Sequence, residues 1–350
     1  MKYIKIFKEH SLYDASKGEL EYPSLSYCEK ENEVHYMPSN SIMFYVGDLS
    51  GKTDQVVTIN YSGGTHDTVS IQEPNKWYSH NIPNGKTLSS VTNLDYIKEA
   101  VVNCDEAFAQ NWKKVDKVSY YNCKLYRDSF YDNFNGSKFT SLDVRTVDTS
   151  NVIRMTNMFS GCNGLTELDV SSFDTSKVTN MESMFNSCHG LTSLDLSNFN
   201  TSNVTTMESM FIYCSGLTSL DVSNFDTSKV TKMDRMFSSC SGLTSLDLSN
   251  FNTSKVTDIG LMFYGCTGLT SLDLSNFNTS NVTKMGGMFL YNRNLTSLDL
   301  SGWDMTNVTD TSSMFEGCSK LTTITMKGCN QATIEKIKSE KPSSATIITE

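Results

Sequence analysis

Apolar and polar positions alternate along most of this chain in a pattern that repeats every 26 residues, beginning at residue 139. In a representative copy, residues 191–196 read Leu-Thr-Ser-Leu-Asp-Leu, which predicts a short strand with its last two leucines facing inward. Residues 204–211 then place Val, Met and Phe side chains at helical spacing, which predicts a short helix. Gly216 ends the copy and is typical of a left-handed turn.

Seven full copies and a partial eighth carry this pattern, and positions within a copy are counted below from its first residue. The copies start at Phe139, Leu165, Leu191, Leu217, Leu243, Leu269, Leu295 and Leu321. One unit of strand, turn, short helix and turn cannot bury its apolar edge alone, whereas stacked units bury a continuous core. The sequence therefore predicts an α/β repeat solenoid, leucine-rich-repeat-like, with one parallel β-sheet and short helices, preceded by a small β-rich domain.

The regions on either side of the array differ from it in pattern. Strand-like runs at 3–7, 41–46, 55–61 and 68–72, separated by Gly and Asn clusters, predict a small β domain at the N-terminus. Downstream, a short helix is expected near Gln331–Ser339 and a last strand over Ala345–Thr349. The predicted organisation is an attachment domain at 1–90, degenerate N-terminal capping repeats at 91–138, the solenoid at 139–326 and a C-terminal cap at 327–350.

Composition and charge narrow the function classes. The formal net charge is −10, which argues against a phosphate-tracking nucleic-acid binder. The mean hydropathy is −0.33, and no apolar run approaches the ~18–20 residues of a membrane-spanning helix. The N-terminal stretch lacks an apolar signal-peptide core, so export through a secretory signal is not expected.

Six of the ten cysteines occupy one repeat column: Cys162, Cys188, Cys214, Cys240, Cys266 and Cys318. Neighbouring copies lie close enough for disulfides on distance alone, and a metal site is the other chemical alternative. Asn292 fills this column in the sixth copy, which indicates a small group that donates a hydrogen bond to backbone. We expect buried, reduced structural thiols.

A column of aspartates follows the predicted strands and is expected on the open face of the sheet. Carboxylates at a spacing of about 5 Å repel one another by roughly 1 kcal/mol per pair in water-like surroundings. A Ca²⁺ ladder would relieve this repulsion, whereas a solvated face softened by neighbouring serines needs no ion. The candidate cation ligands are Asp195, Asp221, Asp247 and Asp273, with calcium the only cofactor considered.

The positions near the end of each copy are mostly Ser, Gly or Asn. In three copies they are apolar or aromatic instead. An outward-facing group of this kind indicates a partner-contact surface, although scatter among weakly constrained positions also produces it. The partner-contact candidates are Ile212, Tyr213, Leu261, Tyr264, Leu290 and Tyr291.

The repeat resembles the BspA-like leucine-rich repeat, a 26-residue repeat of bacterial surface proteins. The matching motifs are Leu-x-x-Leu-Asp-Leu-Ser-Asn-Phe-Asn-Thr-Ser, Val-Thr-x-Met and Met-Phe-x-x-Cys, over residues 139–326. The resemblance implies surface adhesion and binding. An aromatic residue stands where leucine-rich repeats usually carry Asn or Cys, so we expect a stacked aromatic spine instead of an asparagine ladder. The aromatic residues are Phe173, Phe199, Phe225, Phe251, Phe277 and Trp303.

The N-terminal segment is similar to the start of structural proteins from tailed phages of gut bacteria. The residues that carry this similarity are Tyr3, Phe7, His10, Tyr13, Pro23, Ser26-Tyr27-Cys28-Glu29 and Val34-His35-Tyr36. The resemblance implies an attachment or assembly role for residues 1–90.

No nucleophile, acid–base, P-loop or Rossmann pattern occurs in the sequence, and no catalytic residue is proposed. Three functions compete: a non-enzymatic, surface-displayed attachment protein of a phage virion, a bacterial cell-surface adhesin of the BspA-like class, and an enzyme with its site in residues 1–90. The first is favoured, since a virion protein is assembled in the host cytoplasm without a signal peptide. Expected partners are virion or surface proteins through 1–90 and a host-surface protein or glycan through the solenoid, with neither nucleic acid nor membrane insertion; a homo-oligomer is compatible with this function.

Overall fold

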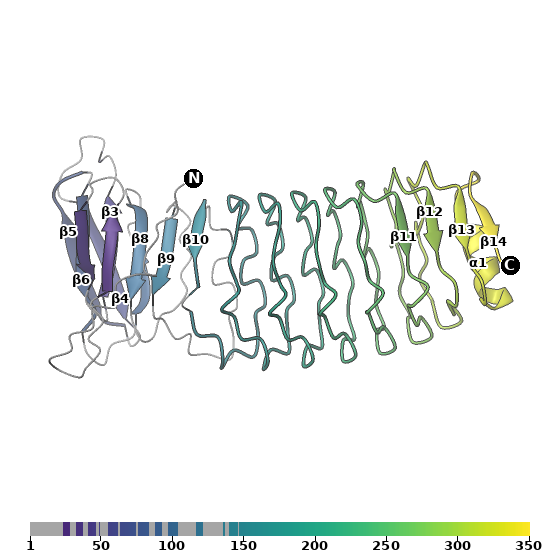
Figure 1. Ribbon diagram of the computed structural model, residues 1–350, viewed down its shortest axis with the longest axis horizontal. Coiled ribbons are helices and arrows are strands. Elements are labelled where there is room, and N and C mark those ends of the chain that lie inside the picture. The colour runs from purple at the N-terminus through teal and green to yellow at the C-terminus, as the bar shows by residue number, and fades with distance from the viewer. Residues whose placement is uncertain are drawn as a thin grey trace, which may run out of the picture.

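The computed structural model is elongated, with a strand-rich N-terminal part, a row of stacked repeats and a C-terminal helix and strand at the far end (Figure 1). The residues that the structure describes are 24–28, 33–37, 41–46, 49, 55–61, 64–74, 76–83, 88–92, 97–103, 117–121, 136, 140–145 and 147–350.

A five-stranded sheet joins the N-terminal part to the first copy, in the order β10-β9-β8-β3-β6. β3 pairs antiparallel with β6 and β8, whereas β8, β9 and β10 are mutually parallel. The strands are β3 (Ser41–Val46), β6 (Lys76–Asn81), β8 (Ile97–Asn103), β9 (Lys117–Tyr121) and β10 (Ser141–Asp143). Because β3 pairs with β8, the predicted domain boundary at residue 90 does not coincide with a break in the sheet.

Two smaller sheets accompany it. β5 (His66–Ile71), β4 (Gln55–Tyr61) and β7 (Leu88–Thr92) form a three-stranded antiparallel sheet, and β1 (Ser24–Cys28) pairs with β2 (Glu33–Met37). The strands predicted at 41–46 and 55–61 are confirmed, and the run at 68–72 lies largely within β5. The run predicted at 3–7 lies outside the described residues.

The prediction of a parallel strand in every copy is only partly correct. The four-stranded C-terminal sheet contains β11 (Ser271–Asp273), β12 (Ser297–Asp299), β13 (Thr323–Thr325) and β14 (Thr346–Ile348), all parallel. With β10, strands therefore occur in the first, sixth, seventh and eighth copies. In the middle copies the same segments lie further apart: Thr218 N donates to Thr192 O at 3.3 Å, compared with 2.8 Å for Thr296 N to Thr270 O.

The prediction of a short helix in each copy is wrong, because none of the described residues of 139–326 forms an α-helix. Positions 19 and 23 adopt left-handed backbone, as at Ser209 (φ 56°) and Tyr213 (φ 61°), and this interrupts any helix. The apolar spacing at 204–211 instead belongs to a run of consecutive turns.

Alternate N–H groups of these turns donate to the next copy and form a ladder, which we call the turn ladder. In the third copy, Ser209 N donates to Asp234 O at 2.9 Å, Phe211 N to Met236 O at 2.9 Å and Tyr213 N to Ser238 O at 2.8 Å. Parallel bridges join equivalent residues beside it, from Arg154 with Asn180 to Lys284 with Asp310. The backbone groups that a helix would pair internally therefore hold the copies together.

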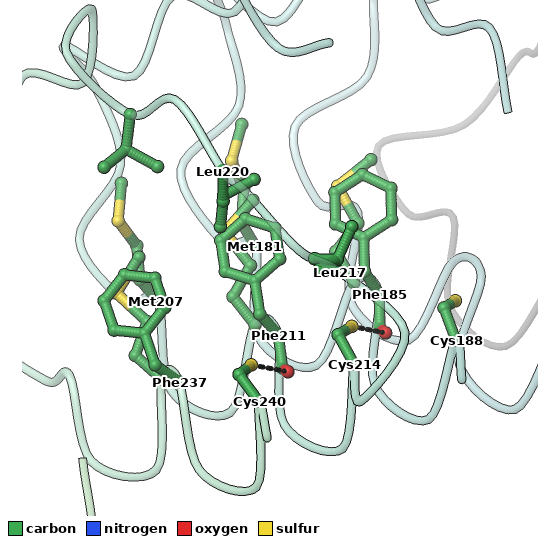
Figure 2. Packing of buried hydrophobic residues seen from close by; sticks show 14 of the residues in the cluster. Met181, Phe185, Cys188, Met207, Phe211, Cys214, Leu217, Leu220, Phe237 and Cys240 are labelled. Atoms are coloured by element: carbon green, nitrogen blue, oxygen red, sulfur yellow. Dashed lines mark hydrogen bonds between the residues drawn. The ribbon is translucent and has the colours of Figure 1, made fainter. Parts of the chain in front are cut away.

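Met and Phe columns fill the core between the copies (Figure 2). The stacked aromatic spine is at position 21, and not in the Phe173–Trp303 column where we expected it. Its rings lie 5.5–5.9 Å apart, with neighbouring planes within 11° of parallel. Its members are Phe159, Phe185, Phe211, Phe237, Phe263, Phe289 and Phe315.

An asparagine ladder is present, which corrects the second half of that expectation. Asn224 Nδ2 donates to Leu196 O and Phe199 O, both at 2.9 Å, and Asn198, Asn250 and Asn276 make equivalent bonds. The asparagine ladder lies one position before the Phe173–Trp303 column. In the seventh copy this position is Gly302, and the Trp303 indole donates to Leu274 O at 3.0 Å instead.

The cysteine column is buried and unbridged, as predicted. Each thiol from Cys188 to Cys318 donates to the carbonyl of the preceding copy's spine phenylalanine at 2.9–3.1 Å, and Figure 2 shows two of these bonds. Asn292 Nδ2 donates to the same kind of carbonyl, Phe263 O, at 2.7 Å. The column therefore satisfies backbone acceptors.

A threonine column at position 11 is also buried, although its segment reads as a polar loop. Thr227 Oγ1 donates to Asn252 O at 3.0 Å and accepts from Asn252 N at 2.7 Å. One hydroxyl thus satisfies both backbone groups of a residue in the next copy. The column comprises Thr149, Thr175, Thr201, Thr227, Thr253 and Thr279.

The glycines that end the copies have a different role from the one we expected. Left-handed backbone occurs elsewhere in the copy, and not at Gly216 or Gly242. A Cβ at Gly216 would collide with the carbonyl oxygens of His189 and Leu191. Close approach of two backbones therefore requires glycine here.

The C-terminal helix and strand lie where the sequence predicts them. Helix α1 (Gln331–Glu340) begins with Asn330, whose side chain accepts from Thr333 N. Lys336 Nζ donates to Met305 O and Val308 O, both at 2.7 Å. These carbonyl groups belong to the last full copy, so α1 binds them where no further full copy follows.

Candidate functional site

The side of the stack that carries the turn ladder is called the turn side below. Four of the six predicted contact residues lie together there, in the fifth and sixth copies. We call these four residues the aromatic patch: Leu261, Tyr264, Leu290 and Tyr291. The Tyr264 and Tyr291 rings meet edge to face with centroids 5.8 Å apart. Arg293 places its guanidinium 5.9 Å from the Tyr291 ring centre. Tyr291 remains 37% exposed, so part of an aromatic pair with one adjacent cation faces solvent.

The other two predicted residues form a separate group. Tyr213 is 46% exposed and meets the His189 ring edge on at 6.3 Å, while Ile212 is half-buried. The fourth copy separates this group from the aromatic patch and has Ser238 and Ser239 at the corresponding positions.

Bulky side chains of the aromatic patch occupy left-handed backbone. Leu261 has φ 55° and Tyr291 has φ 62°, while other copies place Ser, Asn or Gly at these two columns, apart from Arg235 and Tyr213. A residue with a Cβ costs roughly 1–2 kcal/mol in this conformation, and a bulky residue is a genuine outlier there. The patch is therefore maintained against a local backbone penalty.

A glycine in the next copy makes room for each of these two side chains. A Cβ at Gly287 would meet Leu261 Cδ2 at 2.6 Å and Leu290 Cδ2 at 3.5 Å, and a Cβ at Gly317 would collide with the Tyr291 ring. Leu261 and Gly287 are one period apart, as are Tyr291 and Gly317. The sequence of a single copy does not point to these glycines, whereas a comparison of residues one period apart does.

The aspartate column holds its own turns. Asp221 Oδ1 accepts from Ser223 N at 2.9 Å, and Asp195, Asp247 and Asp273 accept from the equivalent serines at 2.9–3.0 Å. The hydrogen bond from the Ser223 N–H lowers the pKa of Asp221, while Asp195 and Asp247 act weakly in the opposite direction. Among the residues that the structure describes, no three His, Cys, Asp or Glu side chains are grouped to hold a metal ion. The calcium ladder stays a prediction.

One acidic side chain on the turn side has a different environment. Asp234 is 8% exposed and pairs with Arg235, whose Nη1 lies 3.0 Å from Asp234 Oδ2. Burial, followed by repulsion from Glu208 and Asp258, raises the pKa of Asp234 to about 6. This carboxyl therefore titrates near neutral pH.

A hydrogen-bonded trio connects strands of two sheets in the N-terminal part. Tyr61 Oη donates to Asp67 Oδ2 at 2.7 Å, and His80 Nε2 lies 2.9 Å from Tyr61 Oη and 3.2 Å from Asp67 Oδ2. Burial is the main reason that the pKa of Tyr61 lies well above its ordinary value, and the hydrogen bond to Asp67 raises this pKa further. Tyr61 is 2% exposed, so the trio serves as a clamp between β4, β5 and β6.

An open hollow of about 590 Å³ lies at the C-terminal end of the turn side, beyond the aromatic patch. It is lined by Ser313, Phe315, Glu316, Gly317, Cys318, Ser319, Glu340 and Pro342. None of these was predicted as a site residue, because the hollow exists only where the last full copy meets the C-terminal helix.

Comparison with protein families gives matches over residues 126–245, 192–271 and 238–340 to a model described as "Mycoplasma protein of unknown function, DUF285". Together these matches span more than half of the chain. The chain belongs to the DUF285 family. This family is related to the BspA-like repeat proteins, which agrees with the resemblance of the 26-residue motif. A search of curated proteins found no match.

The DUF285 matches cover the repeats and the C-terminal helix, and leave residues 1–125 outside. No helix in the described part of the chain is long and apolar enough to cross a membrane.

Proposed function

We propose that this DUF285 protein is a non-enzymatic binding protein, with its stacked copies forming a leucine-rich-repeat-like solenoid of the BspA-like type. The solenoid presents the aromatic patch to a surface ligand. The observation that carries the proposal is the placement of Leu261 and Tyr291 on left-handed backbone. Leu261 is half-buried and Tyr291 is exposed, and a glycine in the next copy leaves room for each side chain.

Stability alone does not account for this arrangement. The other copies fill the same columns mainly with Ser, Asn or Gly and keep the same turn ladder. Serines in these columns bear the same Cβ penalty, but only the large side chains leave apolar area in water. Tyr and Arg are also the residue types that dominate contact energy at protein interfaces.

Attachment is assigned to residues 1–90, which differ from the repeats in pattern and begin with a stretch, residues 3–38, that resembles the start of phage structural proteins. The favoured location is a virion, with near-identical copies offering the same groups at a fixed step to a repetitive host surface. Weak contacts to such a surface add through multivalency. The alternative is a bacterial cell-surface adhesin, and the relation of DUF285 to BspA-like proteins supports it.

The binding test compares the wild-type chain with a Tyr264→Ser/Tyr291→Ser variant on an array of host mucin glycans and bacterial surface polysaccharides. We expect the patch variant to lose binding by about tenfold or more, with no fall in melting temperature, because Ser occupies these columns in other copies. The matched control is Asn186→Ala/Ser187→Ala, at the same positions of the second copy, which should bind normally. Equal binding by all three proteins would exclude the aromatic patch as the contact surface.

The two locations are separated by mass spectrometry of purified phage particles and of washed cell envelopes from the source culture. Enrichment in particles supports the virion assignment, whereas enrichment in envelopes supports the adhesin.

A further inference from the structure

The turn ladder ends at the seventh copy, which is the last full one. In the sixth copy, the N–H groups of Gly287, Phe289 and Tyr291 donate to Ser312 O, Met314 O and Glu316 O at 2.8, 3.0 and 2.7 Å respectively. The equivalent N–H groups of the seventh copy belong to Ser313, Phe315 and Gly317. No acceptor within the described part of the chain pairs with these three.

Ser313, Phe315 and Gly317 are all among the residues that line the hollow. Ser313 and Gly317 are exposed, whereas the equivalent Ser183 and Ser187 of the second copy are only half-exposed. The C-terminal helix covers the neighbouring part of the edge, where Thr311 Oγ1 donates to Glu340 Oε1 at 3.1 Å. Residues 313–317 are therefore an open edge next to a covered one.

The backbone of this edge has the form of a nest. Ser313 (φ 53°) and Gly317 (φ 75°) are left-handed and alternate with right-handed turns, which directs alternate N–H groups to the same side. In each of the six preceding copies, such N–H groups bind main-chain carbonyl oxygens of alternate residues. The molecule itself thus shows which acceptor fits the edge.

The negative charge that lines the hollow favours a peptide over a free anion as its ligand. Glu316 and Glu340 both line the hollow, and their carboxylates repel an anion much more strongly than a neutral carbonyl group. The same carboxylates attract a lysine or arginine side chain.

We propose that residues 313–317 form a docking edge for an extended segment of a protein partner. The segment supplies carbonyl oxygens from alternate residues to the N–H groups of Ser313, Phe315 and Gly317, and places a basic side chain beside Glu316 and Glu340. This mode of recognition adds a strand-like segment to an open backbone edge. It is independent of the aromatic patch and of its proposed ligand.

The probe is a synthetic peptide of residues 231–241, Thr-Lys-Met-Asp-Arg-Met-Phe-Ser-Ser-Cys-Ser, added to the isotope-labelled full chain. Within the protein this segment fills the equivalent edge of the third copy, through Lys232 O, Asp234 O, Met236 O and Ser238 O. Amide exchange is followed by NMR, with Gly287, Phe289 and Tyr291 as internal controls.

We expect the three open amides to exchange much faster than the controls in the chain alone. Saturating peptide should slow them by about tenfold or more and leave the controls unchanged. The same peptide with thioamides at Asp234 and Met236 should bind several-fold more weakly, since sulfur is a poorer acceptor. Glu316→Gln/Glu340→Gln should also weaken the unmodified peptide several-fold.

Four results would overturn the proposal. Protection of the three amides in the dilute chain alone would show that the edge is not open, and exchange unaffected by peptide would show that it does not accept a segment. Protection by inorganic phosphate but not by peptide would identify an anion site. Protection that grows with chain concentration alone would identify self-association.

Discussion

At the level of single residues, the cysteine column shows what a buried polar side chain costs in this stack. Asn292 makes the hydrogen bond that a thiol makes in the other copies, and also donates to Phe289 O at 2.9 Å. Its Oδ1 is buried without a partner in the described part of the chain. A buried acceptor without a hydrogen bond costs about 1–3 kcal/mol.

The first prediction is that Asn292→Cys stabilises the protein by about 1 kcal/mol, because the thiol keeps the bond to Phe263 O and removes the unsatisfied oxygen. The reciprocal Cys240→Asn should destabilise it by a similar or larger amount. Urea unfolding followed by circular dichroism measures both. A lower midpoint for Asn292→Cys would contradict this account of the column.

Asp234 gives the second prediction. Its folded pKa of about 6 lies above the ordinary 3.8, so the folded state holds this proton more tightly than the unfolded state. The resulting stabilisation is fully present below pH 3.8 and is lost as the pH rises through 6. Asp234→Asn should therefore gain about 2 kcal/mol relative to wild type between pH 4 and pH 7.

Urea midpoints at the two pH values measure this change, and Asp221→Asn is the control. The pKa of Asp221 is lowered in the folded state, so its stabilisation is present above pH 3.8 and lost as the pH falls. The protonation of Asp221 changes mainly below pH 4, so Asp221→Asn should leave the difference between pH 4 and pH 7 nearly unaltered. Parallel pH profiles for Asp234→Asn and wild type would refute the assignment.

At the level of elements, backbone turns join the copies along the stack, and thiols, asparagine amides and threonine hydroxyls add side-chain ladders at many of the junctions. The threonine ladder connects loops, where neither strand nor helix supplies hydrogen bonds. Burying a backbone N–H and C=O without partners is costly, so a hydroxyl that both donates and accepts replaces regular structure there.

The third prediction follows from that role. Thr227→Val keeps the side-chain shape but leaves Asn252 N and Asn252 O unpaired, and should destabilise the protein by about 2–3 kcal/mol. Thr227→Ser keeps the hydroxyl and should cost less than half as much. Differential scanning calorimetry compares the two variants, and equal losses would show that the methyl group rather than the hydroxyl matters.

At the level of the whole molecule, the backbone bonds between copies join each copy to the copies directly before and after it. Stability is then close to a sum over copies and their interfaces. The five-stranded sheet covers one end of this stack, and α1 and β14 cover part of the other.

The fourth prediction uses this additivity. Deleting residues 217–242, one whole copy, joins Gly216 to Leu243 and preserves every column, so the shortened chain should fold. Its urea m-value should fall in proportion to the lost surface. Deleting only residues 217–229 puts the Met, Phe, Thr and Asn columns out of register and should give an unfolded or aggregated chain. Circular dichroism and size-exclusion chromatography distinguish these outcomes, and folding of both deletions would disprove the columnar core.

The 26-residue period by itself determined the number of copies, the columns of Met, Phe and Cys in the core, and the outward direction of Tyr213 and Tyr291. Burial follows apolar periodicity directly, so these features can be read from one chain. The N-terminal strands at 41–46 and 55–61 and the helix at 331–340 follow from local alternation and capping in the same way.

Tertiary structure alone decided the conformation of residues 204–211 and the direction of their hydrogen bonds. Their spacing fits a helix equally well, but left-handed residues and the carbonyl groups of the next copy provide partners that a single copy does not show. For the same reason, the roles of Gly287 and Gly317 and the open edge at 313–317 depend on which backbone lies one copy away. Apolar pattern records which side chains are buried, whereas backbone pairing between copies depends on their arrangement in space.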